Sequence, residues 1–144
     1  MDQPDYADLV AAAFAARDLA YTPYSQFRVG AAVLTASGAI FRGGNVENRA
    51  IQASVCAERV ALLSAYAAGE RAIAAIAVVT PTVTVASPCG MCRQVLVELA
   101  PGCTVVLLSI DGKQRITTPE ELLPGKGRAG ENEPSSRLRD GPAV

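Results

Sequence analysis

The chain has 144 residues, of which half are hydrophobic, and its formal net charge is −1. This length and composition suit one ordinary domain with a substantial core, and without a stripe of Lys and Arg a nucleic-acid polymer is not expected as a partner. Because histidine is absent, Ser-His-Asp catalysis, Cys-His catalysis and every imidazole-ligated metal site are excluded.

The N-terminal segment argues against export. The first ten residues, MDQPDYADLV, carry acidic side chains instead of the basic start of a signal peptide. No apolar run in the sequence reaches the length of a membrane span. We therefore expect a cytoplasmic protein that does not bind a membrane.

Hydrophobic periodicity and turn residues divide the chain into alternating helices and strands. In chain order we expect a helix at 5–20, strands at 27–35 and 39–44, a helix at 54–69, a strand at 73–80, a helix at 89–100, strands at 103–109 and 114–118, and a short helix at 119–123. Ser54 is the expected N-cap of the second helix. This alternation predicts an α/β protein with helices on both faces of a mixed sheet.

The last twenty residues differ in composition from the rest. GKGRAGENEPSSRLRDGPAV is rich in Gly, Pro, Ser and charged residues and poor in apolar ones. We expect a single domain over residues 1–124, followed by a flexible C-terminal tail over residues 125–144.

Three cysteines are spaced as ligands of one zinc ion. Cys89 and Cys92 form a Cys-x-x-Cys pair at the predicted start of a helix, and this spacing lets two thiolates bind one metal. Cys56 lies near the start of another predicted helix, where free N–H groups and the helix dipole favour a thiolate. Three protein ligands leave a fourth position for water, which is the arrangement of catalytic zinc.

Two charged residues follow Cys56 in the first turn of that helix. Glu58 would lie beside the metal, where it could take a proton from water and pass it to a ring nitrogen of an amino-heterocycle. Three thiolates leave the zinc site negative, which works against forming hydroxide, and Arg59 would offset that charge. Cys-x-Glu followed by Pro-Cys-x-x-Cys is typical of zinc deaminases.

Other interpretations of the same residues stay open at this point. Cys103 could complete a structural zinc site as a fourth thiolate, although we expect it in the core. The segment PCGMC could instead be a redox pair. Glu58 could be an ordinary acidic residue of a first helical turn, and Arg59 a solvated or interface side chain.

In order and approximate spacing, the segments PYSQFRVGAAVLT, GGNVEN, CAER, SPCGMCRQV and EELLP resemble the small zinc-dependent cytidine deaminases. The resemblance covers roughly residues 10–124. It implies a three-layer α/β/α sandwich around a five-stranded mixed sheet, and a homotetramer with active sites built across subunit contacts. It also implies hydrolysis of cytidine or deoxycytidine to uridine or deoxyuridine plus ammonia.

The resemblance further implies a role for individual residues, although Phe27, Asn45 and Glu47 taken alone could be ordinary core or loop residues. The implied roles are the Zn²⁺ ligands Cys56, Cys89 and Cys92, the proton carrier Glu58, the charge-offsetting Arg59, and the substrate-binding residues Phe27, Asn45 and Glu47.

Two positions depart from the family pattern. Ile51 stands where a tyrosine near the ribose 5′ end is typical, and Gly127 stands where a neighbouring subunit typically supplies a phenylalanine over the base. Arg49 is a candidate for meeting a negative 5′ group. A modified nucleoside or an aminoacyl-nucleoside antibiotic is therefore an alternative substrate, and a non-catalytic zinc-stabilised module is a further alternative.

Overall fold

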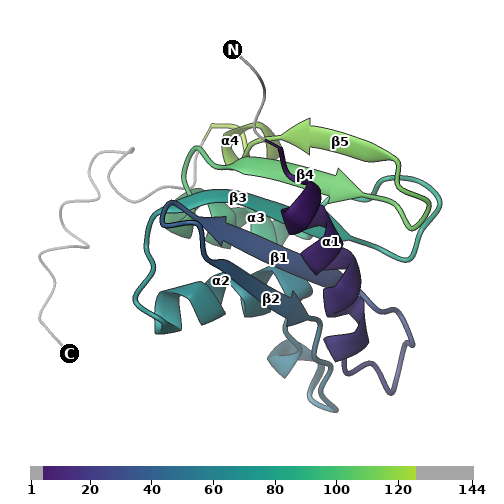
Figure 1. The fold of residues 1–144 in the computed structure, drawn as a ribbon. Coiled ribbons are helices and arrows are strands. Elements are labelled where there is room, and N and C mark those ends of the chain that lie inside the picture. The colour runs from purple at the N-terminus through teal and green to yellow at the C-terminus, as the bar shows by residue number, and fades with distance from the viewer. Residues whose placement is uncertain (1–4, 126–144) are drawn as a thin grey trace, which may run out of the picture.

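The computed structural model describes residues 5–125. Its elements are α1 (Ala7–Ala16), a 3₁₀ turn (Arg17–Leu19), β1 (Gly30–Thr35), β2 (Ile40–Gly44), a second 3₁₀ turn (Ile51–Ala53), α2 (Ala57–Ala67), β3 (Ile73–Val79), α3 (Gly90–Leu99), β4 (Thr104–Leu108), β5 (Gln114–Thr117) and α4 (Pro119–Leu122). The strands form one sheet in the order β2-β1-β3-β4-β5, in which β3 and β4 are parallel and the other neighbours antiparallel (Figure 1). The predicted five-stranded mixed sheet is confirmed.

Apolar clusters lie on opposite faces of this sheet. Leu9 of α1 packs with Ala32 of β1 on one face, while Leu62 of α2 and Leu96 of α3 pack with Val33 on the other. The side chains of successive β1 residues thus point to opposite faces of the sheet, as expected because side-chain direction alternates along a strand. Figure 1 shows α1 in front of the sheet and α2 and α3 behind it, so the three-layer α/β/α arrangement is confirmed.

The second helix begins later than predicted. Its N-cap is Cys56, with extended backbone at φ −70° and ψ 152°, and its first residue is Ala57. Ser54 is not the cap, because Val55 pairs in a β-bridge with Val46 and the chain stays extended up to the cysteine. The Ser54 hydroxyl instead accepts a hydrogen bond of 3.0 Å from the Asn48 N–H.

Close packing fixes where α2 begins relative to the sheet. A Cβ atom on Gly43 of β2 would lie 2.5 Å from the Ala61 nitrogen and 2.8 Å from the Ala57 oxygen. No larger residue fits there without moving the helix, so glycine allows this approach. The N-terminus of α2 is thereby held over the end of the sheet.

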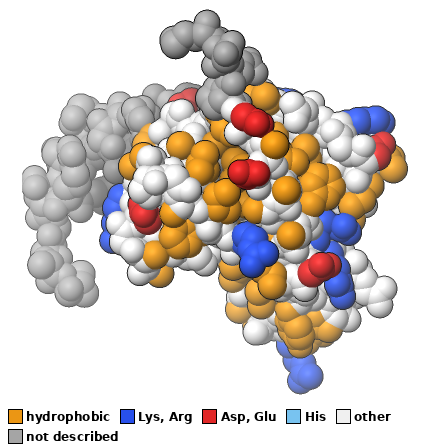
Figure 2. Space-filling model, in the orientation of Figure 1, with side chains coloured by type: hydrophobic (Ala, Val, Ile, Leu, Met, Phe, Trp, Pro, Cys, Tyr) orange, Lys and Arg blue, Asp and Glu red, His pale blue; other side chains and the backbone are white. Residues whose placement is uncertain are grey.

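Two loops lie side by side at one end of the molecule. The 22–27 loop precedes β1, which begins at Gly30 and is shorter than the predicted strand, and the 45–53 loop follows β2. Tyr21, directly before the first loop, links it to the second: its N–H donates to Asn45 O at 2.8 Å, and its carbonyl accepts from the Glu47 N–H at 2.9 Å. Both loops lie in the lower part of Figure 1, and hydrophobic side chains are exposed at that end in Figure 2.

The predicted tail, residues 125–144, lies outside the described residues except for Gly125, and so does Gly127. Across residues 5–125, none of the helices has the length and apolar character needed to cross a membrane.

Candidate active site

Three thiols converge where two helices begin. Cys56 is the N-cap of α2 and Cys89 the N-cap of α3, while Cys92 lies in the first turn of α3. The three Sγ atoms all lie within 4.8 Å of one another, with 3.7 Å from Cys56 to Cys89 and 3.3 Å from Cys89 to Cys92. Segments about thirty residues apart thus form one cluster, as the sequence predicts.

The cluster has the chemistry and dimensions of a zinc site. Zinc binds thiolates at about 2.3 Å in tetrahedral geometry, so two of its ligand sulfurs lie about 3.8 Å apart. The Cys56–Cys89 separation of 3.7 Å matches this value, and the Cys89–Cys92 separation of 3.3 Å is somewhat shorter. Two helix N-termini, with their free N–H groups, favour negative charge at the same place. The Cys92 N–H donates to Cys89 Sγ at 3.4 Å.

The environment favours ionisation of Cys56. Hydrogen bonds from Cys92, and then from Arg59, hold the pKa of the Cys56 thiol well below its usual range despite partial burial. The same interaction with Cys56, together with burial, raises the pKa of Cys92. One thiol of the pair therefore ionises at neutral pH more readily than the other.

Arg59 lies against this cluster. Its Nη2 is 3.6 Å from Cys56 Sγ and 3.5 Å from the Ser54 carbonyl oxygen. Its Nε is buried and has no hydrogen-bond partner within residues 5–125. A guanidinium in this position is adjacent to the thiolates, close enough for its positive charge to offset their negative charge.

Glu58 lies in the first turn of α2, beside the thiols and not among them. Its side chain is only 5% exposed, and burial, followed by the charge of Cys56, raises the pKa of its carboxyl to about 7. It lines a cavity of about 310 Å³ together with Cys56, Cys89 and Phe27. A carboxyl with this pKa can accept and release protons near neutral pH.

Cys103 is not part of the cluster. It is 2% exposed and packs in the core between the sheet and α3, where burial raises the pKa of its thiol to about 12. The structure therefore rules out Cys103 as a fourth ligand, and with it the structural-zinc interpretation that depended on this residue.

Phe27 and Asn45 form another part of the same cavity wall. The Asn45 side chain forms two hydrogen bonds with the segment directly before β1. Its Oδ1 accepts from the Val29 N–H and its Nδ2 donates to the Phe27 carbonyl, each at 2.9 Å. This places the Phe27 ring, which is 43% exposed, at the mouth of the cavity that contains Glu58.

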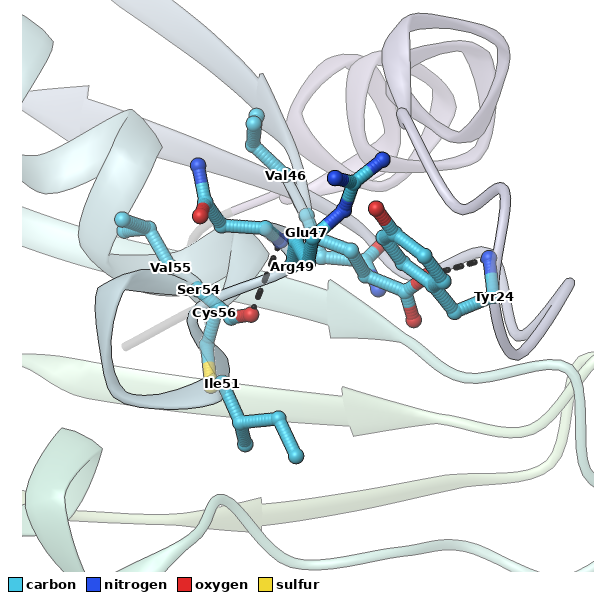
Figure 3. Close-up of a pocket in the computed structure, with 10 residues that line it drawn as sticks. Tyr24, Val46, Glu47, Arg49, Ile51, Ser54, Val55 and Cys56 are labelled. Atoms are coloured by element: carbon cyan, nitrogen blue, oxygen red, sulfur yellow. Dashed lines mark hydrogen bonds between the residues drawn. The ribbon is translucent and has the colours of Figure 1, made fainter.

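Glu47 lies in a second cavity, of about 470 Å³, which shares Asn45 and Cys56 with the first (Figure 3). Its carboxylate accepts hydrogen bonds from the backbone N–H groups of Tyr24, at 3.0 Å, and Ser25, at 3.2 Å, and from the Ser25 hydroxyl. These bonds, the hydroxyl first, lower the pKa of Glu47. Figure 3 shows one of them, to Tyr24.

Arg49 and Ile51 line this second cavity as well. Ile51 is 81% exposed, so the position where the family typically has a tyrosine is open to solvent. Tyr24 and Ser25 were not predicted from the sequence, because their partner Glu47 lies more than twenty residues away. The only signal in the sequence was their place two or three residues before Phe27 in PYSQF.

Together, the mixed sheet, the three thiols at two helix starts and the buried glutamate beside them define a zinc deaminase type of site. The family model for the "Cytidine and deoxycytidylate deaminase zinc-binding region" matches residues 4–108. The chain belongs to this family, and its cofactor is zinc.

Individual relatives agree with this assignment. A cytidine deaminase from Halalkalibacterium halodurans is 48% identical over 118 residues, covering 81% of this chain and 89% of the relative. A blasticidin-S deaminase from Bacillus cereus is 36% identical over 110 residues, covering 71% and 78%. The crystal structure of a cytidine deaminase from Burkholderia pseudomallei superposes with a TM-score of 0.81 at 49% identity, covering 84% of this chain and 98% of that one.

Proposed function

We propose that the protein hydrolyses cytidine or deoxycytidine to uridine or deoxyuridine and ammonia. The observation that carries the proposal is the buried Glu58 in the wall of a cavity that is also lined by Cys56 and Cys89 of the three-thiol cluster. Family membership and the names of the relatives from H. halodurans and B. pseudomallei support cytidine as the substrate.

In this proposal Cys56, Cys89 and Cys92 hold the zinc ion. The chemistry that zinc supplies when bound is Lewis acidity, which makes water at the site a stronger acid. Arg59 compensates part of the thiolate charge, which would otherwise oppose loss of a proton from that water. Its Nη2 lies 3.6 Å from Cys56 Sγ, which supports this role.

Glu58 moves the protons. Its carboxylate accepts one proton from water and delivers it to N3 of the pyrimidine while the water oxygen bonds to C4. The second proton of the same water goes to the amino group, the C4–N bond breaks, and ammonia leaves. A pKa near 7 lets one carboxyl act as base and then as acid in this sequence.

The remaining cavity residues bind and orient the nucleoside. Phe27 offers an exposed ring on which a flat base can stack. Asn45 uses one of its two amide hydrogens on Phe27, which leaves one for the substrate. Glu47 lies beyond Asn45 with a negative carboxylate, a suitable acceptor for a ribose hydroxyl.

The test is release of ammonia from cytidine and deoxycytidine by the purified protein, with zinc content measured on the same sample. We expect stoichiometric ammonia and uridine, with about one zinc per chain. A protein that contains zinc and leaves both nucleosides unchanged would refute cytidine as the substrate.

A second candidate substrate is a base-modified aminopyrimidine such as an aminoacyl-nucleoside antibiotic. The exposed Ile51 and the 470 Å³ cavity around it favour this candidate, as does the similarity to a blasticidin-S deaminase. Arg49, in the same cavity, would meet a negative group on such a substrate. Competition between cytidine and the antibiotic for limiting enzyme distinguishes the two candidates.

We also propose that the protein works in the cytoplasm as a homotetramer. Its thiols are all free and include a cluster suited to metal, which fits a reducing compartment. Tyr24, Phe27 and Ile51 are exposed hydrophobic side chains around the two cavities, as expected of a surface that another subunit covers. Light scattering on the purified protein tests the assembly.

A further inference from the structure

The 22–27 loop holds one residue in an unusual backbone conformation. Gln26 has φ +58°, and within residues 5–125 it is the one residue other than glycine with positive φ. Such a conformation persists in a bulky residue only when surrounding contacts impose it. The residue that follows is Phe27, so the contacts that fix this loop also decide where the Phe27 ring lies.

A serine hydroxyl provides one of these contacts. Ser25 Oγ donates to Glu47 Oε2 and accepts from the Phe27 N–H, the latter at 3.0 Å. The hydroxyl therefore connects Glu47 directly to the backbone of Phe27. Asn45 fixes the other side of the same residue through the Phe27 carbonyl. Both backbone polar groups of Phe27 are thus bound by side chains.

The same contacts limit what Glu47 can still accept. An ionised carboxylate has about four lone-pair sites. Oε1 accepts from the N–H groups of Tyr24 and Ser25, and Oε2 accepts from the Ser25 hydroxyl. One site on Oε2 therefore remains, which is enough for a single hydroxyl of a ligand, next to the serine hydroxyl that fixes its direction.

We propose that Ser25 is a positioning residue that orients the Glu47 carboxylate toward one sugar hydroxyl of the substrate and, through the Phe27 N–H, sets the ring against the base. The inference rests on the proposed function, because it needs a nucleoside in the cavity. Ser25 itself acts through Glu47 and Phe27 and does not touch the reacting atoms.

The kinetic test compares Ser25→Ala with Ser25→Thr, which keeps a hydroxyl at an exposed position. The matched control is Ser37→Ala, whose hydroxyl also donates to a carboxylate, Glu70 Oε1 at 2.8 Å, but in the β1–β2 turn. Loss of a hydrogen bond to a charged group predicts about a tenfold rise in KM for Ser25→Ala. We expect kcat within about threefold, rescue by threonine, and no change in Ser37→Ala.

Substrates that lack one hydroxyl give the decisive comparison. Cytidine, 2′-deoxycytidine and 3′-deoxycytidine should differ in KM for the wild type, and Ser25→Ala should reduce that difference. In a Glu47→Ala background, the additional effect of Ser25→Ala on KM should be clearly smaller than in the wild type, because only the contact with the Phe27 N–H is then left to lose. Equal losses for all three nucleosides, or a full effect of Ser25→Ala without Glu47, would overturn the proposal.

Hydrogen exchange at the Phe27 amide gives a readout that does not need activity. Protection should be lost in Ser25→Ala and kept in Ser25→Thr and Ser37→Ala. Unchanged protection in Ser25→Ala would also overturn the proposal. Should the wild type release no ammonia, the proposed function fails, and binding of uridine measured by calorimetry replaces KM: affinity lost in Ser25→Ala supports the role of Ser25, and unchanged affinity refutes it.

Discussion

The two ends of the candidate active site are built in different ways. At the metal end, Cys92 is fully buried and Glu58 nearly so, and both lie in the first turns of helices that pack against the sheet. At the other end, which we call the sugar end because it includes Glu47, Phe27 and Ile51 are exposed residues of the two loops. In the proposed function, rigid elements thus hold the groups that perform the chemistry and loops hold those that select the substrate, and loops tolerate substitution better.

This contrast predicts the largest effects for the metal ligands. Replacing Cys56, Cys89 or Cys92 with alanine should remove zinc and abolish ammonia release, because protein would then fill only two of the four positions of a tetrahedral site. Metal analysis and activity on the same samples give the measurement. Cys103→Ala is the matched control, and it should keep both zinc and activity because this thiol lies in the core.

A chelator should likewise remove activity before it unfolds the chain, which circular dichroism would follow alongside the assay. Loss of zinc in Cys103→Ala, or retention of zinc in any of the other three variants, would contradict the assignment of ligands.

Replacement of a glutamate at each end gives the next largest effect and the clearest contrast. Glu58→Gln should keep about one zinc per chain and lower kcat by at least the 10²–10⁴-fold typical of acid–base catalysis, because glutamine cannot carry the proton. Glu47→Gln should mainly raise KM, since Glu47 binds without exchanging protons. Activity of Glu58→Gln within about tenfold of the wild type would exclude Glu58 as the proton carrier.

The same contrast explains what the sequence could predict. The metal end can be predicted from short motifs, since Cys-x-Glu and Pro-Cys-x-x-Cys each place their residues within one helical turn. Only the meeting of two helix starts depends on the fold. Periodicity predicted the layers and the five strands. The start of α2 was missed because a β-bridge between Val46 and Val55 keeps the chain extended past Ser54, a contact that local propensity does not contain.

The sugar end was less predictable for a related reason. The link between Ser25 and Glu47 joins residues 22 positions apart, and nothing in the spacing of PYSQF and NVEN indicates that the two segments meet. Phe27, Asn45 and Glu47 were predicted from a resemblance, whereas the hydrogen bonds that fix them come only from tertiary structure. Local motifs therefore predicted the chemistry, and only the fold showed how the loops are held.

Substitution at the open loop position should have a moderate effect. Ile51→Tyr adds a hydroxyl that can bond to the sugar. One neutral hydrogen bond stabilises a complex by about 1 kcal/mol, so the KM for cytidine should fall roughly fivefold. Because Ile51 is 81% exposed, stability should hardly change. Steady-state kinetics on cytidine and on an aminoacyl-nucleoside test this expectation, and turnover of the bulkier compound should fall.

Ile40→Tyr is the control for that substitution, because Ile40 is a partly exposed isoleucine at the start of β2, remote from both cavities. A similar fall in KM in Ile40→Tyr, or no change in Ile51→Tyr, would show that the open position does not face the substrate.

The smallest expected effect is the dependence of stability on pH at Glu47. Hydrogen bonding, chiefly from the Ser25 hydroxyl, holds the pKa of Glu47 below its ordinary value. A lowered folded pKa gives stability that is present above the unfolded pKa, about 4.3, and is lost as the pH falls through the folded pKa. The difference in free energy of unfolding between wild type and Glu47→Gln should therefore be constant above about pH 5 and shrink below about pH 4.3.

Urea denaturation between about pH 3 and 7 measures this difference, and loss of zinc in acid affects both proteins alike. A difference that stays constant down to about pH 3 would mean that the hydrogen bonds to the Glu47 carboxylate contribute nothing in solution, and that the loops at the sugar end are held by the backbone bonds of Tyr21 and the side chain of Asn45.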